Sequence, residues 1–374
     1  MYELDIFLSC GEPSGDHYAG RLISGLLALY PETKIQGMMG MEGRDAGGDP
    51  LWDISELGLM GISDVIHSLP RLFRLKSSIT RYVMEKDIPM VIVIDAPDFH
   101  LPLIRSLRDQ GYSGKIIYIS PPTVWAWRKG RAKVLKNTVD LCLPLFPFED
   151  RALKELGVQS RWMGHPFVDE FMGSFDMCHV PQWKSSAKRI AILPGSRRGE
   201  INRLLPVFIE AAEELRASGM IPVFSVAPFL EDDMRTSVLE QLKGFESYQG
   251  SARDLMFSSD LVLGASGTAA VEAMMLGRFM IVAYKGSLSS YIVYRTMVKT
   301  EFISIPNILS GEKVFPELIQ KDVTVSRILQ ETDHYLKDRQ YASRVRELTL
   351  LGKHRMGDPG AVGFWIRCIL EHLP

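Results

Sequence analysis

Short, largely apolar runs separated by longer segments constrain the fold of this chain more than any other feature of its sequence. They are rich in isoleucine and valine and do not alternate between apolar and polar residues, which is typical of strands in a parallel sheet covered by helices on both faces. They lie at Leu4–Ser9, Lys34–Met39, Met90–Asp95, Lys115–Ser120, Leu141–Phe146, Arg189–Pro194, Ile221–Ala227, Asp260–Gly264 and Phe279–Tyr284. Segments with helical spacing lie between them, such as Gly15–Leu29, Glu200–Ala217 and Thr268–Leu276. The alternation predicts an α/β fold built from βαβ units.

The alternation is interrupted between His165 and Lys188 by a stretch with turn-forming residues and no strand. A new βα unit begins at Arg189, so we interpret the interruption as a linker between two domains. The length of 374 residues agrees with this interpretation, because one domain usually has roughly 150 residues. Two such domains facing each other would leave a cleft, the usual ligand site of this fold class.

Composition and charge exclude several classes of protein. Hydrophobic residues make up 46% of the chain and charged residues 24%, which rules out global disorder. The net charge of -2 argues against a general nucleic-acid binder, because such proteins need a basic excess. The cysteines form no Cys-x-x-Cys pair and the histidines no His-x-x-x-His pair, so we expect neither a zinc site nor a disulfide framework. With no basic leader and no apolar run of ~20 residues, we expect a soluble protein that at most lies on a membrane surface.

The turn after the first expected strand contains Gly11, Glu12, Ser14 and Gly15 and opens a helix. A helix N-terminus of this kind favours anions, although the spacing matches neither the GxGxxG nor the Walker A pattern. The alternative interpretation is an ordinary tight turn in which Ser14 or Asp16 caps the helix.

Asp95 stands at the end of an apolar strand, at the rim where α/β folds place their chemistry. A carboxylate there is suited to accept a proton from a substrate hydroxyl. The alternative is an Asx turn that organises the loop. We expect Asp98, directly after Pro97, to cap the next helix.

The turn after the strand that begins at Arg189 contains Gly195, Arg197 and Arg198 before a helix. Cations at a helix N-terminus are unfavourable unless an anion is bound, so this pattern indicates a phosphate or oxyanion site. The alternative is a pair of surface arginines.

A second turn of this type contains Ser266, Gly267, Thr268 and Ala269. Its backbone N–H groups are suited to hold a pyrophosphate, and Glu272, one turn into the helix, is suited to reach a ribose diol. The alternative is a helix capped by Thr268.

The segment Ser63–Val83 combines apolar residues at spacings of three and four with basic neighbours, which suits a helix lying on anionic lipid. The candidate membrane contacts are Val65, Ile66, Leu69, Leu72 and Phe73. The alternative is an amphipathic helix that faces the core. The C-terminal segment Ala361–Leu373 is also amphipathic, and it suits either packing on the first domain or a partner.

Taken together, these segments resemble the lipid-A-disaccharide synthase family, which are glycosyltransferases of the GT-B class. The resemblance covers nearly the whole chain, with the motifs in the family's order. They are Gly11-Glu12-Pro13-Ser14-Gly15-Asp16, Ile94-Asp95-Ala96-Pro97-Asp98-Phe99, Val124-Trp125-Ala126-Trp127-Arg128, Leu193-Pro194-Gly195-Ser196-Arg197, Ser266-Gly267-Thr268-Ala269 with Glu272, and Ile305-Pro306-Asn307-Ile308-Leu309.

The resemblance implies two Rossmann-like domains facing a cleft, with a C-terminal helix that crosses back to the first domain. We expect an acceptor and membrane-facing domain over 1–168, a UDP-sugar donor domain over 169–345, and helices that return to the first domain over 346–374. The implied enzyme is an inverting transferase that joins UDP-2,3-diacylglucosamine to 2,3-diacylglucosamine 1-phosphate. The products are a β-1,6-linked disaccharide 1-phosphate, on the pathway to lipid A of Gram-negative bacteria, and UDP.

The resemblance also implies residue roles and partners. Asp95 matches the family's essential aspartate and would act as general base. The donor UDP would contact Arg197, Ser266, Gly267, Thr268, Ala269, Glu272 and Asn307, and the acceptor-side loop would comprise Gly11, Glu12, Ser14 and Gly15. The family acts without a metal or other cofactor, in the cytoplasm, on the surface of the inner membrane. The sequence leaves the oligomeric state open, a homodimer included.

Two segments depart from the family pattern, and three rival functions remain. The departures are Gly37-Met38-Met39-Gly40-Met41 and Ser120-Pro121-Pro122-Thr123, both on the acceptor side, so the acyl preference is the least constrained property. The rivals are another GT-B transferase such as a peptidoglycan-type N-acetylglucosaminyltransferase, a UDP-sugar epimerase, and a non-catalytic protein of the membrane surface.

Overall fold

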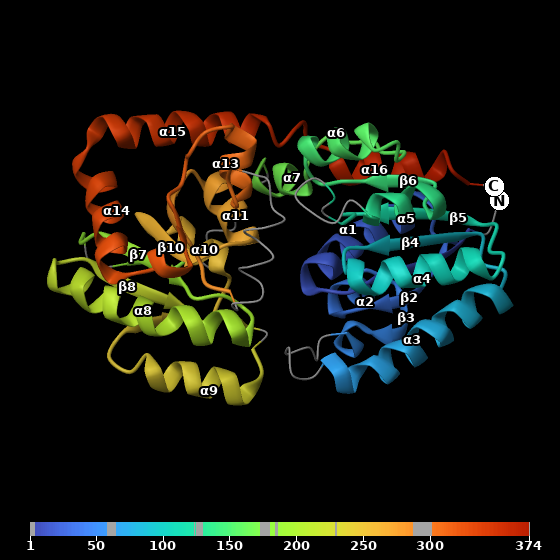
Figure 1. Ribbon diagram of the computed structural model, residues 1–374, viewed down its shortest axis with the longest axis horizontal. Helices are drawn as coiled ribbons and strands as arrows, with labels where there is room; N and C mark the ends of the chain where they lie inside the picture. Colours follow the sequence, from blue (N-terminus) through green and yellow to red (C-terminus); the bar gives the residue numbers. More distant parts are fainter. Residues whose placement is uncertain are drawn as a thin grey trace. The chain divides into compact units, whose positions relative to one another are not determined.

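The chain forms two compact α/β units, which the computed structural model describes over residues 4–57, 65–122, 124, 130–172, 180–183, 186–228, 230–286 and 301–373, with only the backbone described for 65–68. The first unit comprises Met1–Asp169 and Gly357–Pro374, and the second comprises Glu170–Met356. Each unit contains one parallel sheet with helices packed against it (Figure 1). The predicted α/β architecture with two parallel sheets is therefore confirmed.

The sheet of the first unit has the strand order β3-β2-β1-β4-β5-β6, and all of its pairs are parallel. Its strands are β1 (Asp5–Cys10), β2 (Lys34–Met39), β3 (Asp49–Asp53), β4 (Met90–Ile94), β5 (Lys115–Ile119) and β6 (Leu141–Leu143). Every residue of the central β4, Met-Val-Ile-Val-Ile, is buried, as expected where helices cover both faces.

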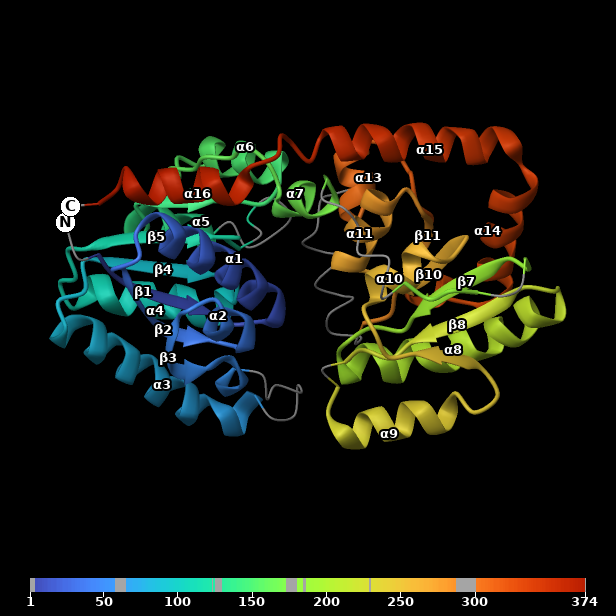
Figure 2. The ribbon, with the colours of Figure 1, turned by 180° about the vertical axis from the view of Figure 1, so that it is seen from behind.

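Helices cover both faces of this sheet. They are α1 (Pro13–Leu29), α2 (Met41–Asp45), η1 (Ile54–Glu56), α3 (Val65–Glu85), α4 (Pro97–Asp109), α5 (Gly130–Thr138), α6 (Pro147–Glu155) and α16 (Ala361–Leu370). Helix α7 (Pro166–Met172) spans the boundary between the two units. One core cluster joins α3, α4 and α5 to strand residues such as Phe7 and Val93. Helix α1 packs against β1, β2 and β4, and Figure 2 shows α16 lying beside it.

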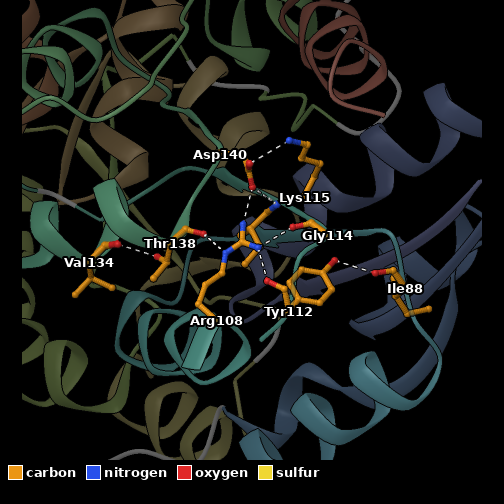
Figure 3. A network of polar contacts seen from close by, with 9 residues as sticks. Ile88, Arg108, Tyr112, Gly114, Lys115, Val134, Thr138 and Asp140 are labelled. Carbon is orange, nitrogen blue, oxygen red and sulfur yellow. Dashed lines mark hydrogen bonds and ion pairs between the residues drawn. The ribbon is translucent and has the colours of Figure 1, made fainter. Parts of the chain in front are cut away.

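One arginine ties together the amino ends of β5 and β6. Arg108, near the end of α4, donates to the carbonyls of Tyr112 at 2.7 Å, Gly114 at 2.8 Å and Thr138 at 3.1 Å (Figure 3). It also pairs with Asp140 at 2.7 Å. These contacts satisfy the carbonyl of Thr138 at the end of α5, which has no partner within its helix, and two carbonyls of the loop between α4 and β5. They lie opposite the carboxyl ends of the strands.

The sheet of the second unit has the strand order β12-β11-β10-β7-β8-β9 and is also parallel. Its strands are β7 (Arg189–Leu193), β8 (Ile221–Ser225), β9 (Glu246–Tyr248), β10 (Leu261–Ala265), β11 (Phe279–Tyr284) and β12 (Glu317–Ile319). Its helices are α8 (Arg198–Ala217), α9 (Asp232–Gln241), α10 (Ala252–Phe257), α11 (Thr268–Leu276), α13 (Ile305–Ser310), η2 (Gln320–Asp322), α14 (Val325–Lys337) and α15 (Arg339–His354).

The structure differs from the sequence-based expectation at the sheet edges and at the ends of the units. The apolar pattern misses β3, β9 and β12, which are short edge strands with polar residues. The stretch expected to be a linker contains α7. The third expected segment, 346–374, begins inside α15, which packs on α11 and α13 within the second unit. The return to the first unit begins at Gly357 instead.

Candidate active site

Asp95 directly follows β4 at the carboxyl edge of the first sheet, where a sharp turn leads into α4. Asp95 and Ala96 both adopt the left-handed backbone conformation, with φ of 54° and 39°. This conformation costs on the order of 1 to 3 kcal/mol for each residue other than glycine. Because such strain persists only where the surroundings impose it, the turn is a candidate functional feature.

The Asp95 carboxylate faces the turn between β1 and α1. Its Oδ1 accepts a hydrogen bond of 3.1 Å from the N–H of Gly11, and its Oδ2 is buried with no hydrogen-bond partner among the described residues. A Cβ atom at Gly15 would overlap Oδ2, and one at Gly11 would overlap the Cβ of Ala96. Both glycines are therefore required for the close approach of this turn to the carboxylate.

The charge state of Asp95 is shifted by its surroundings. Burial, and after it the charge of Glu12, raise the pKa of Asp95 to about 8, although the N–H groups of Gly11, Glu12 and Gly15 offset part of the effect. A carboxyl group with a pKa near the operating pH is well matched to general base catalysis.

Three buried side chains that no sequence motif indicates lie behind Asp95. The Nδ1 of His100 donates to the backbone carbonyl of Asp95 at 2.8 Å, and the hydroxyl of Tyr118 donates to the same carbonyl at 2.7 Å. Ser9 is hydrogen-bonded to the Nε2 of His100 at 2.8 Å. A histidine five residues after the aspartate was the available signal, but the contact to Ser9 spans 91 positions and leaves no local pattern.

The residues around these turns correct the expected cap at Asp98 and do not support the alternative caps at Ser14 and Asp16. Glu12, not Ser14 or Asp16, occupies the N-cap position of α1. Asp16 instead accepts hydrogen bonds from the N–H groups of 40, 42 and 43 at the start of α2. The N-cap position of α4 belongs to Ala96, and Asp98, in the first turn, pairs with Arg131 of α5.

In the second unit, the turns after β7 and β10 meet because these two strands are neighbours. A Cβ atom built at Gly195, whose φ is 116°, would lie 3.6 Å from the Cβ of Ala265. Arg197 lies exposed at the N-cap position of α8. Its neighbour Arg198 pairs with Glu231 and Asp233 at 2.7 Å each, so the acidic start of α9 neutralises Arg198.

The turn after β10 presents backbone groups at the start of α11. Gly267 is its N-cap, with φ of 155° and ψ of -152°, a conformation essentially limited to glycine. The alternative interpretation, a helix capped by Thr268, is therefore wrong. The N–H of Ser266 donates to the carbonyl of Ala283 at 2.9 Å. The N–H groups of Thr268 and Ala269 lie in the first turn of the helix, where they have no intrahelical partner. They are the groups suited to a phosphate.

Glu272 lies further along α11, within an ion-pair cluster. It is 3.6 Å from Arg253, which also pairs with Glu170 at 2.6 Å and lies over the ring of Phe171 at 4.5 Å. A carboxylate in this position can accept hydrogen bonds from vicinal hydroxyls, but Arg253 already restrains it.

The expected contact between Asn307 and the donor is not supported by the structure. Asn307 is fully buried. Its amide group donates to the carbonyl of Phe315 at 2.9 Å and to Glu317 at 2.8 Å. Its Oδ1 accepts from the N–H groups of Val314 and Phe315 at 2.9 Å each. Because all four hydrogen-bonding positions of its side chain are used within this loop, Asn307 shapes the loop.

The apolar side chains of α3 divide between an exposed face and a face that packs on the core. Leu69 and Phe73 are exposed by 42% and 59%, whereas Ile79 is fully buried. Leu72 is partly buried against the core. The side chains of Val65 and Ile66 lie outside the described residues, as do Trp125–Arg128 of the tryptophan motif. Across the described ranges, no helix is long and apolar enough to cross a membrane.

Comparison with known proteins decides the family. Residues 6–359 match the family model described as lipid-A-disaccharide synthetase. The chain belongs to this family. It is 35% identical over 381 residues to the lipid-A-disaccharide synthase of Myxococcus xanthus, which covers 99% of this chain and 97% of the relative. It is 33% identical over 350 residues to that of Alcanivorax borkumensis, covering 91% of this chain and 90% of the relative. The predicted family and enzyme class are confirmed.

Solved structures support the GT-B fold. A putative UDP-N-acetylglucosamine 2-epimerase from Listeria monocytogenes matches with a TM-score of 0.70 at 12% identity, covering 100% of this chain and 97% of that one. The calicheamicin glycosyltransferase matches with a TM-score of 0.60 at 14% identity, covering 100% of both chains. At such low identity these neighbours show the fold alone, so the epimerase rival shares only the architecture.

Proposed function

We propose that this chain condenses UDP-2,3-diacylglucosamine with 2,3-diacylglucosamine 1-phosphate, giving the β-1,6-linked disaccharide 1-phosphate and UDP. Membership of the lipid-A-disaccharide synthetase family supports this reaction. The observation that carries the mechanism is the Asp95 carboxylate, held against a glycine turn with one oxygen unpartnered among the described residues.

Asp95 acts as the general base in this proposal. The donor sugar is α-linked to UDP and the product is β-linked, so a single in-line displacement accounts for the inversion. As the acceptor's 6-oxygen bonds to the anomeric carbon, the bond from that carbon to UDP breaks and the hydroxyl proton moves to Oδ2. Gly11 and Gly15 present only backbone beside the carboxylate, because a Cβ atom at either position would collide with this turn.

The turns of the second unit hold the donor in this proposal. The departing UDP gains negative charge, and preorganised donors aimed at such charge usually make the largest contribution to catalysis. The N–H groups of Thr268 and Ala269 at the start of α11 and the guanidinium of Arg197 at the start of α8 supply these donors. Glu272, restrained by Arg253, accepts hydrogen bonds from the ribose hydroxyls.

Both substrates carry acyl chains, so the enzyme must meet them at a lipid surface. Leu69 and Phe73 are exposed apolar side chains on α3, and Lys76 lies over the ring of Phe73 at 5.4 Å. Apolar residues beside cations are suited to an anionic interface. We assign the first unit to the acceptor and the cytoplasmic face of the inner membrane, and the second unit to the donor.

Asp95→Asn tests the proposal, because asparagine keeps the shape of the side chain but is not a base. We expect the turnover number for disaccharide formation to fall by about 10²- to 10⁴-fold, while UDP affinity measured by calorimetry stays unchanged. Asp109→Asn, an exposed carboxyl on α4, is the matched control and retains activity. Substantial activity in the Asp95 variant would remove this residue from the role. Isomerised UDP-sugar in place of disaccharide would support the epimerase rival.

A further inference from the structure

We infer that His100 and Tyr118 are positioning residues, which hold the backbone of Asp95 so that its carboxylate faces the Gly11–Gly15 turn. The inference rests on the proposed role of Asp95 as general base. These two side chains touch neither the substrate nor the reacting atoms, and they act through the backbone carbonyl of Asp95.

The two side chains converge on one backbone atom. His100, in the first turn of α4, reaches the Asp95 carbonyl at 2.8 Å, and Tyr118, on β5, reaches it at 2.7 Å. Both side chains are fully buried, with 0% exposure. Two buried donors on one carbonyl occupy both of its lone pairs, so the peptide plane after Asp95 is fixed from two independent elements.

The hydrogen-bond pattern defines a single tautomer of His100. A carbonyl only accepts, so Nδ1 carries the proton, and Nε2 of the neutral ring then accepts from the hydroxyl of Ser9 at 2.8 Å. Burial lowers the pKa of His100 to about 4, so the ring is neutral at physiological pH. The donor and the acceptor are therefore fixed in each hydrogen bond that runs from Ser9 through His100 to the Asp95 carbonyl.

The network also connects the two sides of the site. Ser9 lies on β1, two residues before Gly11, and it is aligned with Val93 of β4. The strand that leads into the glycine turn is thus tied, through Ser9 and His100, to the residue that carries the carboxylate. A small rotation at Asp95 would break the contact of 3.1 Å between Oδ1 and the Gly11 N–H.

The strained backbone explains why such support is needed. Asp95 and Ala96 are both left-handed, and neither is glycine. Without the two hydrogen bonds on its carbonyl, the turn would relax toward the ordinary region of backbone conformation and move the carboxylate away from the glycine turn. Residues held in this way cluster at functional sites because the surrounding structure over-determines them.

The test compares His100→Leu, His100→Asn and Tyr118→Phe with the wild-type enzyme in a steady-state assay that uses the proposed acceptor and donor. We expect His100→Leu to lower kcat by about 10- to 100-fold, since a misplacement of the order of 1 Å has this effect, while the donor KM changes by less than about threefold. Tyr118→Phe should lower kcat by about 3- to 10-fold. His100→Asn should restore most of the rate, because its amide nitrogen takes the place of Nδ1 and can donate to the carbonyl.

His372→Leu is the matched control, because the Nδ1 of His372 also bonds to a backbone carbonyl, that of Cys368, at 2.8 Å in the same unit. It should leave kcat unchanged. Wild-type kcat in folded Tyr118→Phe and His100→Leu, while Asp95→Asn is inactive, would overturn the positioning role and leave the base intact. An active Asp95→Asn would overturn both. Equal losses in His100→Leu and His100→Asn would also contradict the inference. Tyr118→Phe keeps the buried ring, so it tests the idea even if His100→Leu fails to fold.

Discussion

Replacing Asp95 by asparagine should stabilise the folded protein at neutral pH, although it should abolish turnover. The carboxyl group is buried against the Gly11–Gly15 turn, and its ionisation in the folded state is unfavourable. Asparagine has nearly the same shape, can accept the same hydrogen bond from the Gly11 N–H, and never ionises. The variant therefore removes the free-energy cost of keeping this carboxyl group protonated at neutral pH, without creating a cavity.

The size of the effect follows from the pKa. The pKa of Asp95 rises from 3.8 to about 8 on folding, and one pKa unit corresponds to about 1.4 kcal/mol, which sets an upper limit of about 6 kcal/mol. Between these two pH values the folded protein keeps a proton that the unfolded chain has lost. The stability of the wild type therefore falls as pH rises from about 4 to about 8. Below and above this range, the contribution of Asp95 to the free energy of unfolding does not change with pH.

Urea denaturation of both proteins between pH 5 and pH 9 measures this effect. We expect the difference in unfolding free energy, variant minus wild type, to grow by up to about 1.4 kcal/mol per pH unit and to level off above pH 8. Taking the difference cancels the other titrating groups, and Asp109→Asn provides the baseline for an exposed carboxyl. A variant that is less stable than the wild type at pH 8, or a difference that is flat with pH, would refute the argument that burial dominates at Asp95.

Two further predictions concern α3 and the loop after α13. The double variant Leu69→Ser, Phe73→Ser should weaken co-sedimentation with anionic vesicles while changing the free energy of unfolding by less than about 1 kcal/mol. The buried control Ile79→Ala should lower the free energy of unfolding by about 2 to 5 kcal/mol. Unfolding of the double variant would show that Leu69 and Phe73 belong to the core. Asn307→Ala should cost about 2 to 4 kcal/mol in urea denaturation, because it leaves buried N–H groups unpaired, with UDP affinity of the folded protein kept within about threefold. Loss of UDP binding without loss of stability would restore a direct contact with the donor.

The sequence predicts the layered architecture well because burial on both faces dictates composition. A strand such as β4 can contain only apolar residues, and that run is visible without a structure. Edge strands need not consist of apolar residues alone, since one of their two edges has no neighbouring strand and is open to water. Glu246–Tyr248 has no buried residue and leaves no apolar run to detect.

The turns of the candidate site are predictable for a similar reason, whereas their support is not. Glycines, a strand-end carboxylate and helix starts follow one another in the chain, so their spacing can be read directly. His100 and Tyr118 matter through contacts with a single carbonyl, and a buried histidine or tyrosine looks the same in sequence whether it binds a peptide group or only fills space. Asn307 shows the converse case, because this polar residue inside a signature also satisfies four groups of its own loop, which the signature alone does not indicate.

The left-handed turn at Asp95 and Ala96 has a consequence for engineering. Changes there that relax the backbone or remove the buried carboxyl group raise the free energy of unfolding, so a library screened for heat tolerance alone will enrich them. Such a screen would steadily select thermostable, inactive proteins. Directed evolution of this enzyme therefore needs a selection for turnover in every round, or positions 95 and 96 held constant.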